Sequence, residues 1–106
     1  MQRGEVWWAN LPEPWGRRPV LLLSRNQAYE LLNGAIAAPL TTKLRSVPTM
    51  VRLEPREDGV PRTCVVNLDA LQFVLFSRLS ERITLLGTAK MRHVEDALRF
   101  ALELQP

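Results

Sequence analysis

The side chains best suited to chemistry in the first half of this sequence are basic. Arg17, Arg18, Arg25, Lys43 and Arg45 lie there, and the chain carries 14 Lys and Arg against 11 Asp and Glu, a net charge of +3. A guanidinium can donate two parallel hydrogen bonds to phosphate oxygens and keeps its charge at physiological pH. This pattern is compatible with a polyanionic ligand, although a small basic excess also occurs in proteins that bind none.

Thr41 and Thr42 stand directly before Lys43 in the segment APLTTK. A hydroxyl at a strand end beside Arg18 could donate to the same phosphate, and Lys43 and Arg45 would extend a positive track along a nucleic-acid backbone. The same residues also fit a strand-edge arginine that faces water or a carboxylate, next to two threonines that favour a strand. Residue types alone leave both interpretations open.

Single copies of histidine and cysteine exclude several kinds of site. With His93 as the only histidine, one chain cannot supply a two-histidine acid and base, and we expect His93 to be a solvated helix residue. Cys64 alone can form neither an intrachain disulfide nor a cysteine-rich zinc site. With no clustered acidic run either, we expect no metal and no other cofactor.

The elements that must position these residues are mostly strands. Apolar runs and alternation predict strands at residues 4–11, 18–24, 35–40, 49–53, 64–68, about 71–74 and 82–86. Turn residues predict a loop at 12–16, breaks at 33–34 and 55–61 and a short turn at 77–80. Residues 28–32 can form one helical turn.

The one long helix is predicted at the C-terminal end, beginning near Gly87 and Thr88. A helical spacing is shared by Met91, Val94, Leu98, Ala101 and Gln105, with the stripe widened by Ala97 and Leu102. Opposite charges four residues apart predict two ion pairs, Arg92 with Asp96 and Glu95 with Arg99.

Length and composition predict one domain covering residues 1–106, because 46% of residues are hydrophobic and 24% are charged. Short strands followed by one helix predict an α+β fold that is mainly β, a largely antiparallel, partly closed sheet with the helix packed on an open side. No segment approaches the roughly 18 apolar residues of a membrane helix, and the first residues lack a signal peptide. We therefore expect no membrane association and a cytoplasmic location.

Three tryptophans offer apolar surface near the basic residues. Trp7 and Trp8 are consecutive in a predicted strand, so they must face opposite sides of the sheet. We expect one to join the core and the other to cover a dimer partner. Trp15, in the predicted loop PEPWG, is the better candidate for stacking on a base.

Three segments in order, RGEVWWANL, RRPVLLLS and APLTTK, resemble the MazF/PemK family of toxin endoribonucleases. The later stretches VPRTCVVNLDAL and RLSERITLLG are similar to the second half of that family, so the resemblance spans nearly the whole chain. It implies an SH3-like barrel of the CcdB/MazF kind, a homodimer and sequence-selective cleavage of single-stranded RNA. It also implies inhibition by a MazE-like cognate antitoxin whose acidic tail occupies the RNA groove.

The resemblance also assigns roles to residues. The family's catalytic arginine, directly before a proline, falls on Arg18, and its catalytic threonine, two residues after a proline, falls on Thr41. The resemblance also implies that Asn67, Asp69 and Gln72 lie where the family contacts bases, although Asn67 could equally be a structural hydrogen-bonding residue. The other substrate-binding candidates follow from residue type and position: Trp15, Arg17, Thr42, Lys43 and Arg45. The first loop, PEPWGR, is shorter than in many relatives and lacks their Ser-Glu-Gln-like segment; Glu13 and Trp15 are the residues available there.

RNA cleavage through its own 2′-hydroxyl requires a proton acceptor, a proton donor and stabilisation of charge on the phosphate oxygens. Arg18 suits the third role, and a guanidinium, which stays protonated at physiological pH, is a poor base. Two alternatives have different requirements. A gyrase-binding toxin of the CcdB kind relies on a C-terminal Trp-Gly-Ile, whereas this chain ends LELQP. A non-catalytic RNA-binding barrel would need only a basic groove, with Arg18 and Thr41 incidental.

Overall fold

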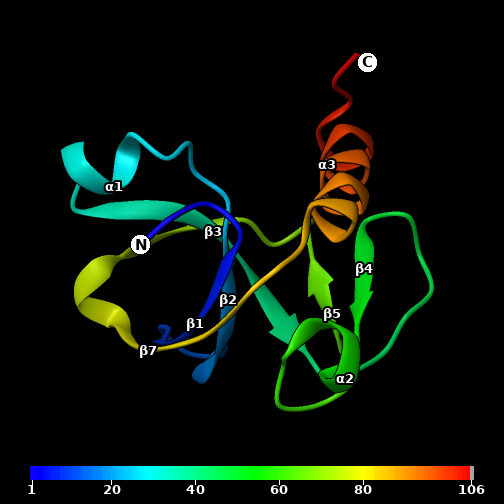
Figure 1. The fold of residues 1–106 in the computed structure, drawn as a ribbon, viewed down its shortest axis with the longest axis horizontal. Helices are drawn as coiled ribbons and strands as arrows, with labels where there is room; N and C mark the ends of the chain where they lie inside the picture. The colour runs from blue at the N-terminus through cyan, green and yellow to red at the C-terminus, as the bar shows by residue number, and fades with distance from the viewer. Residues whose placement is uncertain (106) are drawn as a thin grey trace.

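The computed structural model describes residues 1–105 and contains a strongly curled, mostly antiparallel sheet (Figure 1). Its strands are β1 (Glu5–Asn10), β2 (Arg17–Leu22), β3 (Gly34–Thr41), β4 (Met50–Leu53), β5 (Cys64–Asn67), β6 (Gln72–Leu75) and β7 (Leu79–Leu85). The helices are α1 (Ala28–Leu31), α2 (Pro55–Asp58), the 3₁₀ turn η1 (Phe76–Arg78) and α3 (Thr88–Leu102). The predicted fold class, mainly β with a C-terminal helix, is confirmed.

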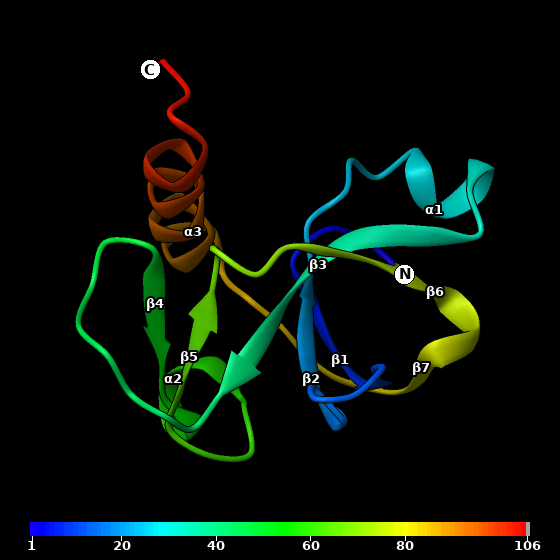
Figure 2. The ribbon, with the colours of Figure 1, turned by 180° about the vertical axis from the view of Figure 1, so that it is seen from behind.

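The long strand β3 joins the two halves of the sheet. Its first residues pair with β6, its last residues pair with β5, and its middle pairs with β2, giving the order β4-β5-β3-β2-β1-β7. Among the described residues β4 and β7 remain the two ends of this path, so the sheet curls without closing. Beyond Pro39 the end of β3 leaves β2 and runs on beside β5 (Figure 2).

Two apolar clusters fill the two sides of the curled sheet. The larger lies under α3 and includes Leu21, Leu53, Val66 and Val94; the smaller lies between β1, β2, β3 and β6. Of the two consecutive tryptophans, Trp7 packs against the smaller cluster but stays half-buried, so it borders the core without being buried in it.

Helix α3 begins after Gly87, as predicted, and buries Met91, Val94 and Ala97. The predicted place of Leu102 on the apolar stripe is wrong, because α3 projects past the sheet and leaves this side chain 52% exposed (Figure 1). Within residues 1–105, no helix is long and apolar enough to cross a membrane.

Both predicted ion pairs on α3 are also wrong. Arg99 Nη1 lies 3.0 Å from Asp96 Oδ1, three residues away, and Glu95 Oε2 lies 3.2 Å from Arg3 Nη1. Glu95 faces the N-terminal segment, so a tertiary partner replaces the helical one.

Strand β7 starts earlier than predicted, at Leu79 instead of Arg82. It pairs with β1 through two register irregularities, between Val6 and Trp7 and between Trp8 and Ala9. Such bulges break the alternation of apolar and polar residues on which the prediction depended. The segment predicted as a break at 55–61 contains the single turn of α2.

Candidate active site

A tight loop of residues 11–16 joins β1 to β2 and determines where the first arginines lie. Leu11 N donates to Gly16 O at 3.1 Å, and Trp15 N donates to Pro12 O at 3.0 Å. Gly16 has a φ of +66°, a conformation that glycine adopts without the penalty of a side chain. This compact loop turns the carbonyl of Trp15 toward β2.

Arg18 is held by that loop. Its Nε atom donates to Trp15 O at 2.6 Å, and its guanidinium carbon lies 5.4 Å from the centroid of the Trp15 ring. Across the ladder Arg18 is opposite Ala9, a buried residue of the smaller cluster. Within residues 1–105 its two terminal nitrogens have no hydrogen-bond partner, so the planar fork is oriented and still available to an anion.

Thr41 lies at the same edge of the sheet. The ladder between β2 and β3 ends at the pair Val20 and Pro39, and Arg18 and Thr41 each lie two residues beyond this pair. The Thr41 Oγ1 accepts a hydrogen bond from Lys43 N at 3.2 Å, which leaves the hydroxyl proton free to donate. Both residues line one cavity of about 460 Å³, so the two predicted catalytic residues are brought together.

Arg17 also lines this cavity but belongs to the opposite face of β2. Its guanidinium carbon lies 4.4 Å from the centroid of the Trp8 ring, within range of a cation–π interaction. Thr42 lines the cavity too. Trp15 is half-buried against the smaller cluster, with Arg18 over its ring. Base stacking by Trp15 stays a prediction.

The predicted positive track divides after β3. Lys43 is exposed two residues after Thr41, whereas Arg45 lines a separate cavity of about 590 Å³ with Leu44 and Met50. Neither Lys43 nor Arg45 lines the cavity that contains Arg18, although the backbone N–H of Lys43 donates to Thr41 Oγ1.

The three predicted base-contacting residues lie outside the cavity that contains Arg18. Asn67 ends β5, and its Oδ1 accepts a hydrogen bond from Asp69 N at 3.0 Å, forming a local turn. Asp69 is exposed, and Gln72 begins β6 opposite Ala37. Within one chain the structure does not bring them together with Arg18.

Among the polar and aromatic residues of the cavity, two were missed as binding candidates: Trp8 and Arg62. The alternation of β1 and β2 puts Trp8 on the same face as Arg17, a signal that was present in the sequence. Arg62 carried no such signal, because the connection between α2 and β5 reaches the cavity only through tertiary contacts.

Neither the single cysteine nor the single histidine is placed to take part in the chemistry at Arg18. Burial, together with the charges of Asp58 and Glu54, raises the pKa of the Cys64 thiol to about 11, so it stays protonated at neutral pH. His93 is exposed on α3 and lines a different cavity, beside Met50 and Lys90. Across residues 1–105, no three His, Cys, Asp or Glu side chains converge in a way that could hold a metal ion.

Comparison with known proteins decides the family. The model for the PemK-like, MazF-like toxin of type II toxin-antitoxin systems matches residues 2–102. The chain belongs to this family. The probable endoribonuclease MazF5 of Mycobacterium tuberculosis is 43% identical to this MazF-like toxin over 101 residues, which is 95% of this chain and 92% of the relative.

Solved structures agree with this MazF-like fold. An endoribonuclease in complex with its cognate antitoxin, from a mycobacterial species, superposes with a TM-score of 0.88 at 28% identity, covering 100% of this chain and 98% of the other. A MazE-MazF complex from Deinococcus radiodurans gives a TM-score of 0.81 at 25% identity, covering 99% and 97%. The resemblance noted from sequence is confirmed over the whole fold.

Proposed function

We propose that this MazF-like toxin is an endoribonuclease that cuts single-stranded RNA at the cavity lined by Arg18 and Thr41. The observation that carries the proposal is the guanidinium of Arg18, fixed by the carbonyl of Trp15 with its terminal nitrogens free and a threonine hydroxyl beside it. A positioned donor group of this kind stabilises charge that develops on a phosphate in the transition state. The relatives named endoribonucleases favour this function over gyrase binding or passive RNA binding.

In the proposed reaction the 2′-oxygen of the RNA attacks the neighbouring phosphorus, and the bond from phosphorus to the 5′-oxygen breaks. The 2′-hydroxyl loses its proton and the departing 5′-oxygen gains one. Arg18 stabilises the charge on the two non-bridging oxygens, and the Thr41 hydroxyl donates to one of them. The products are a 2′,3′-cyclic phosphate and a 5′-hydroxyl, and the protein supplies the electrostatic stabilisation without a metal.

The test is cleavage of a long single-stranded RNA in excess EDTA, with the chemistry of both new ends determined. We expect discrete cuts that survive the chelator and disappear when the nucleotide 5′ to the cut carries a 2′-O-methyl group. An Arg18→Ala preparation controls for contaminating nuclease. Cleavage that requires a divalent ion, or that continues at the 2′-O-methyl position, would contradict the proposal.

We also propose that the toxin acts in the cytoplasm as a homodimer. The tryptophans are not its main exposed apolar surface, since Trp7 and Trp8 are both half-buried. Ile36 of β3 and Phe73 of β6 are instead cross-strand neighbours that are 48% and 55% exposed, with Leu75 beside them. A second copy would cover this face. Light scattering tests it: wild-type protein should be a dimer at micromolar concentration and Phe73→Lys should be monomeric.

A cognate antitoxin with an acidic tail completes the proposal. Such a tail would lie against Arg17, Arg18 and Lys43 and compete with RNA for them. The similar mycobacterial endoribonuclease was solved with its own antitoxin. Competition should weaken as salt is added, and simultaneous independent binding of tail and uncleavable RNA would contradict it.

A further inference from the structure

A second, mostly apolar cavity adjoins the one that contains Arg18. Its volume is about 90 Å³, and seven of its eight lining residues also line the Arg18 cavity. The eighth is Cys64, which is buried like Leu40, whereas Pro61 and Arg62 are exposed. The two cavities are thus one continuous groove with a charged part and an apolar part.

The walls of the apolar part come from two sources. Trp8 of β1 and Pro19 of β2 are directly opposite each other in the ladder and share a face of the sheet. Pro61 and Arg62 belong to the connection between α2 and β5 and line the same cavity as Trp8 and Pro19. Trp8 and two proline rings therefore provide flat apolar surface.

The connection that carries Pro61 and Arg62 is fixed at its beginning. Gly59 ends α2 with a φ of +75°, and a Cβ atom added there would lie 2.6 Å from Thr84 Oγ1. The next residue, Val60, is 3% exposed and packs in the larger cluster. Gly59 and Val60 therefore hold the backbone in place directly before Pro61.

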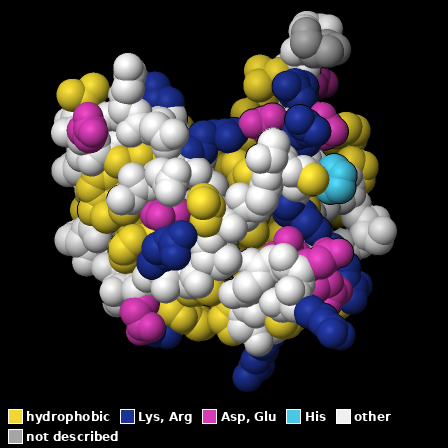
Figure 3. Space-filling view, in the orientation of Figure 1, with side chains coloured by type: hydrophobic (Ala, Val, Ile, Leu, Met, Phe, Trp, Pro, Cys, Tyr) yellow, Lys and Arg dark blue, Asp and Glu magenta, His cyan; other side chains and the backbone are white. Residues whose placement is uncertain are grey.

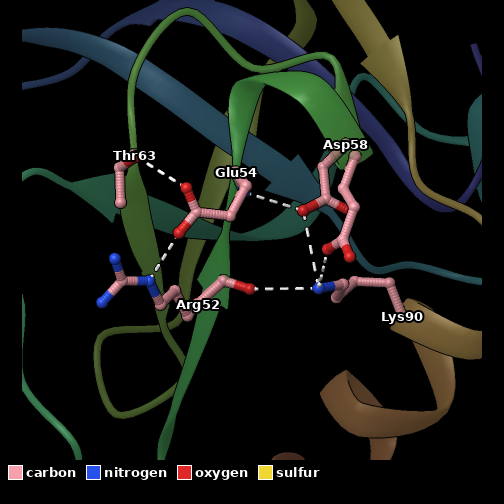
Figure 4. A network of polar contacts seen from close by, with 6 residues as sticks. Arg52, Glu54, Asp58, Thr63 and Lys90 are labelled. Carbon is pink, nitrogen blue, oxygen red and sulfur yellow. Dashed lines mark hydrogen bonds and ion pairs between the residues drawn. The ribbon is translucent and has the colours of Figure 1, made fainter.

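The end of this connection, next to β5, is fixed by a polar network (Figure 4). Glu54 accepts hydrogen bonds from Thr63 Oγ1 at 2.8 Å and from Arg52 Nε at 2.7 Å. Hydrogen bonds from Arg52 and Thr63 lower the pKa of Glu54, so the carboxylate remains ionised and accepting at neutral pH. Asp58 accepts from Glu54 N at 2.8 Å and lies 3.5 Å from Lys90 Nζ.

Acidic and basic side chains lie side by side on the molecular face seen in Figure 3, where α2 and α3 meet. The network thus joins α2, β4 and the start of β5 to α3. The connection contains no long strand or helix, so the network is what holds it in place. A preorganised binding wall requires such support.

We propose that the apolar cavity binds one nucleobase of the RNA, next to the phosphate held by Arg18, with its ring against Trp8 and Pro61 and its polar edge toward Arg62. This assignment rests on the proposed function. A nucleobase is the flat, largely apolar group that always lies beside a phosphate in RNA, and aromatic surfaces are its usual partners in single strands. Arg62 has no hydrogen-bond or ion-pair partner within residues 1–105, so its donors are available.

The N–H groups of the Arg62 guanidinium should determine which bases bind in the cavity. A guanidinium recognises carbonyl oxygens on a base edge, as in its paired contacts with guanine. Guanine, uracil and cytosine carry such an oxygen and adenine does not. The cavity should therefore disfavour adenine at one position beside the cut.

The experiment is to sequence every cut made in a random single-stranded RNA pool by wild-type protein and by the Arg62→Gln and Arg62→Lys variants. Arg56→Gln is the matched control, because Arg56 is exposed on α2 and lines neither part of the groove. We expect wild-type and Arg56→Gln proteins to avoid adenine at one position about tenfold, and both Arg62 variants to lose most of that preference at this position alone. Melting temperatures verify that all variants fold.

A second variant tests the stacking surface. Trp8→Ala should raise the half-saturating RNA concentration about tenfold to a hundredfold while the same bonds are cut. Cut profiles of the Arg62 variants identical to that of Arg56→Gln would overturn the base cavity and leave the proposed function intact. Failure of wild-type protein to cut any RNA would overturn the proposed function itself.

Discussion

Two adjacent arginines at the start of β2 have different surroundings. Arg18 is half-buried and bound to the carbonyl of Trp15, whereas Arg17 is exposed and stacks on Trp8. A hydrogen-bonded guanidinium keeps one orientation, as transition-state stabilisation requires, while an exposed one can follow a mobile chain. We therefore expect the Arg18 face to carry the chemistry and the Arg17 face, with its apolar cavity, to carry binding.

The largest effect should come from removing the fork on the Arg18 face. Arg18→Ala should reduce single-turnover RNA cleavage by about 100- to 1000-fold, because one positioned donor group is lost from the transition state. Arg18→Lys keeps the charge but loses the planar fork, and it should be similarly impaired. Arg25→Ala, at an exposed arginine outside the groove, is the control. An Arg18→Lys protein with near wild-type cleavage would contradict the bidentate clamp.

RNA binding on the Arg17 face should depend on the polar network of Glu54, Asp58 and Lys90, which holds the connection that carries Arg62. Lys90→Met removes an ammonium that is 20% exposed and leaves the 6%-exposed Asp58 carboxylate without its charged partner. We expect a loss of about 1–3 kcal/mol in the free energy of unfolding, measured by urea denaturation, and weaker RNA binding with a smaller change in maximal cleavage rate. Arg92→Met, an exposed change on the same helix, should have little effect. Equal destabilisation by both variants would show that the network is not structural.

The smallest effect concerns Glu5, which supports Trp7 behind the Arg18 face. Burial opposes ionisation of Glu5, but hydrogen bonds from Trp7, Arg82 and the backbone of Gln2 outweigh it and lower its pKa below 4.5. The stabilisation is therefore complete above about pH 4.5 and is lost as the pH falls through the lowered value.

Thermal unfolding between pH 3 and 7 measures this contribution. Glu5→Gln should flatten the acid side of the profile, whereas Glu30→Gln, at an exposed carboxyl, should leave it unchanged. A Glu5→Gln profile as steep as that of wild-type protein would exclude the carboxylate as the source of acid sensitivity.

The sequence predicted the Arg18 side of the site well and the Arg17 side poorly. Arg18 and Thr41 stand at ends of neighbouring strands that local composition identifies, and both line one cavity. Arg62 follows a single helical turn whose position depends on Glu54, Thr63 and Lys90, and no local pattern encodes such contacts. This is why the part of the cavity wall that contains Arg62 could not be predicted.

Other errors have the same origin. The bulges between β1 and β7 concealed the first residues of β7, and Glu95 pairs with Arg3, which is distant in sequence, instead of its helical neighbour. Periodicity predicts an element from its own residues. It does not predict which distant residue will contact that element, and most of these errors depended on such a contact.

The division between the two arginines is tested most directly by matched neutral variants, Arg18→Gln and Arg17→Gln, in single-turnover cleavage over a range of RNA concentrations and at several salt concentrations. We predict that Arg18→Gln lowers the maximal rate about 100-fold or more with little change in the half-saturating concentration. Arg17→Gln should raise the half-saturating concentration about tenfold and leave the maximal rate nearly unchanged. The slope of log affinity against log salt concentration should become smaller by about one, because one phosphate contact is lost. Equal losses of maximal rate in the two variants, or the reverse pattern, would contradict the account.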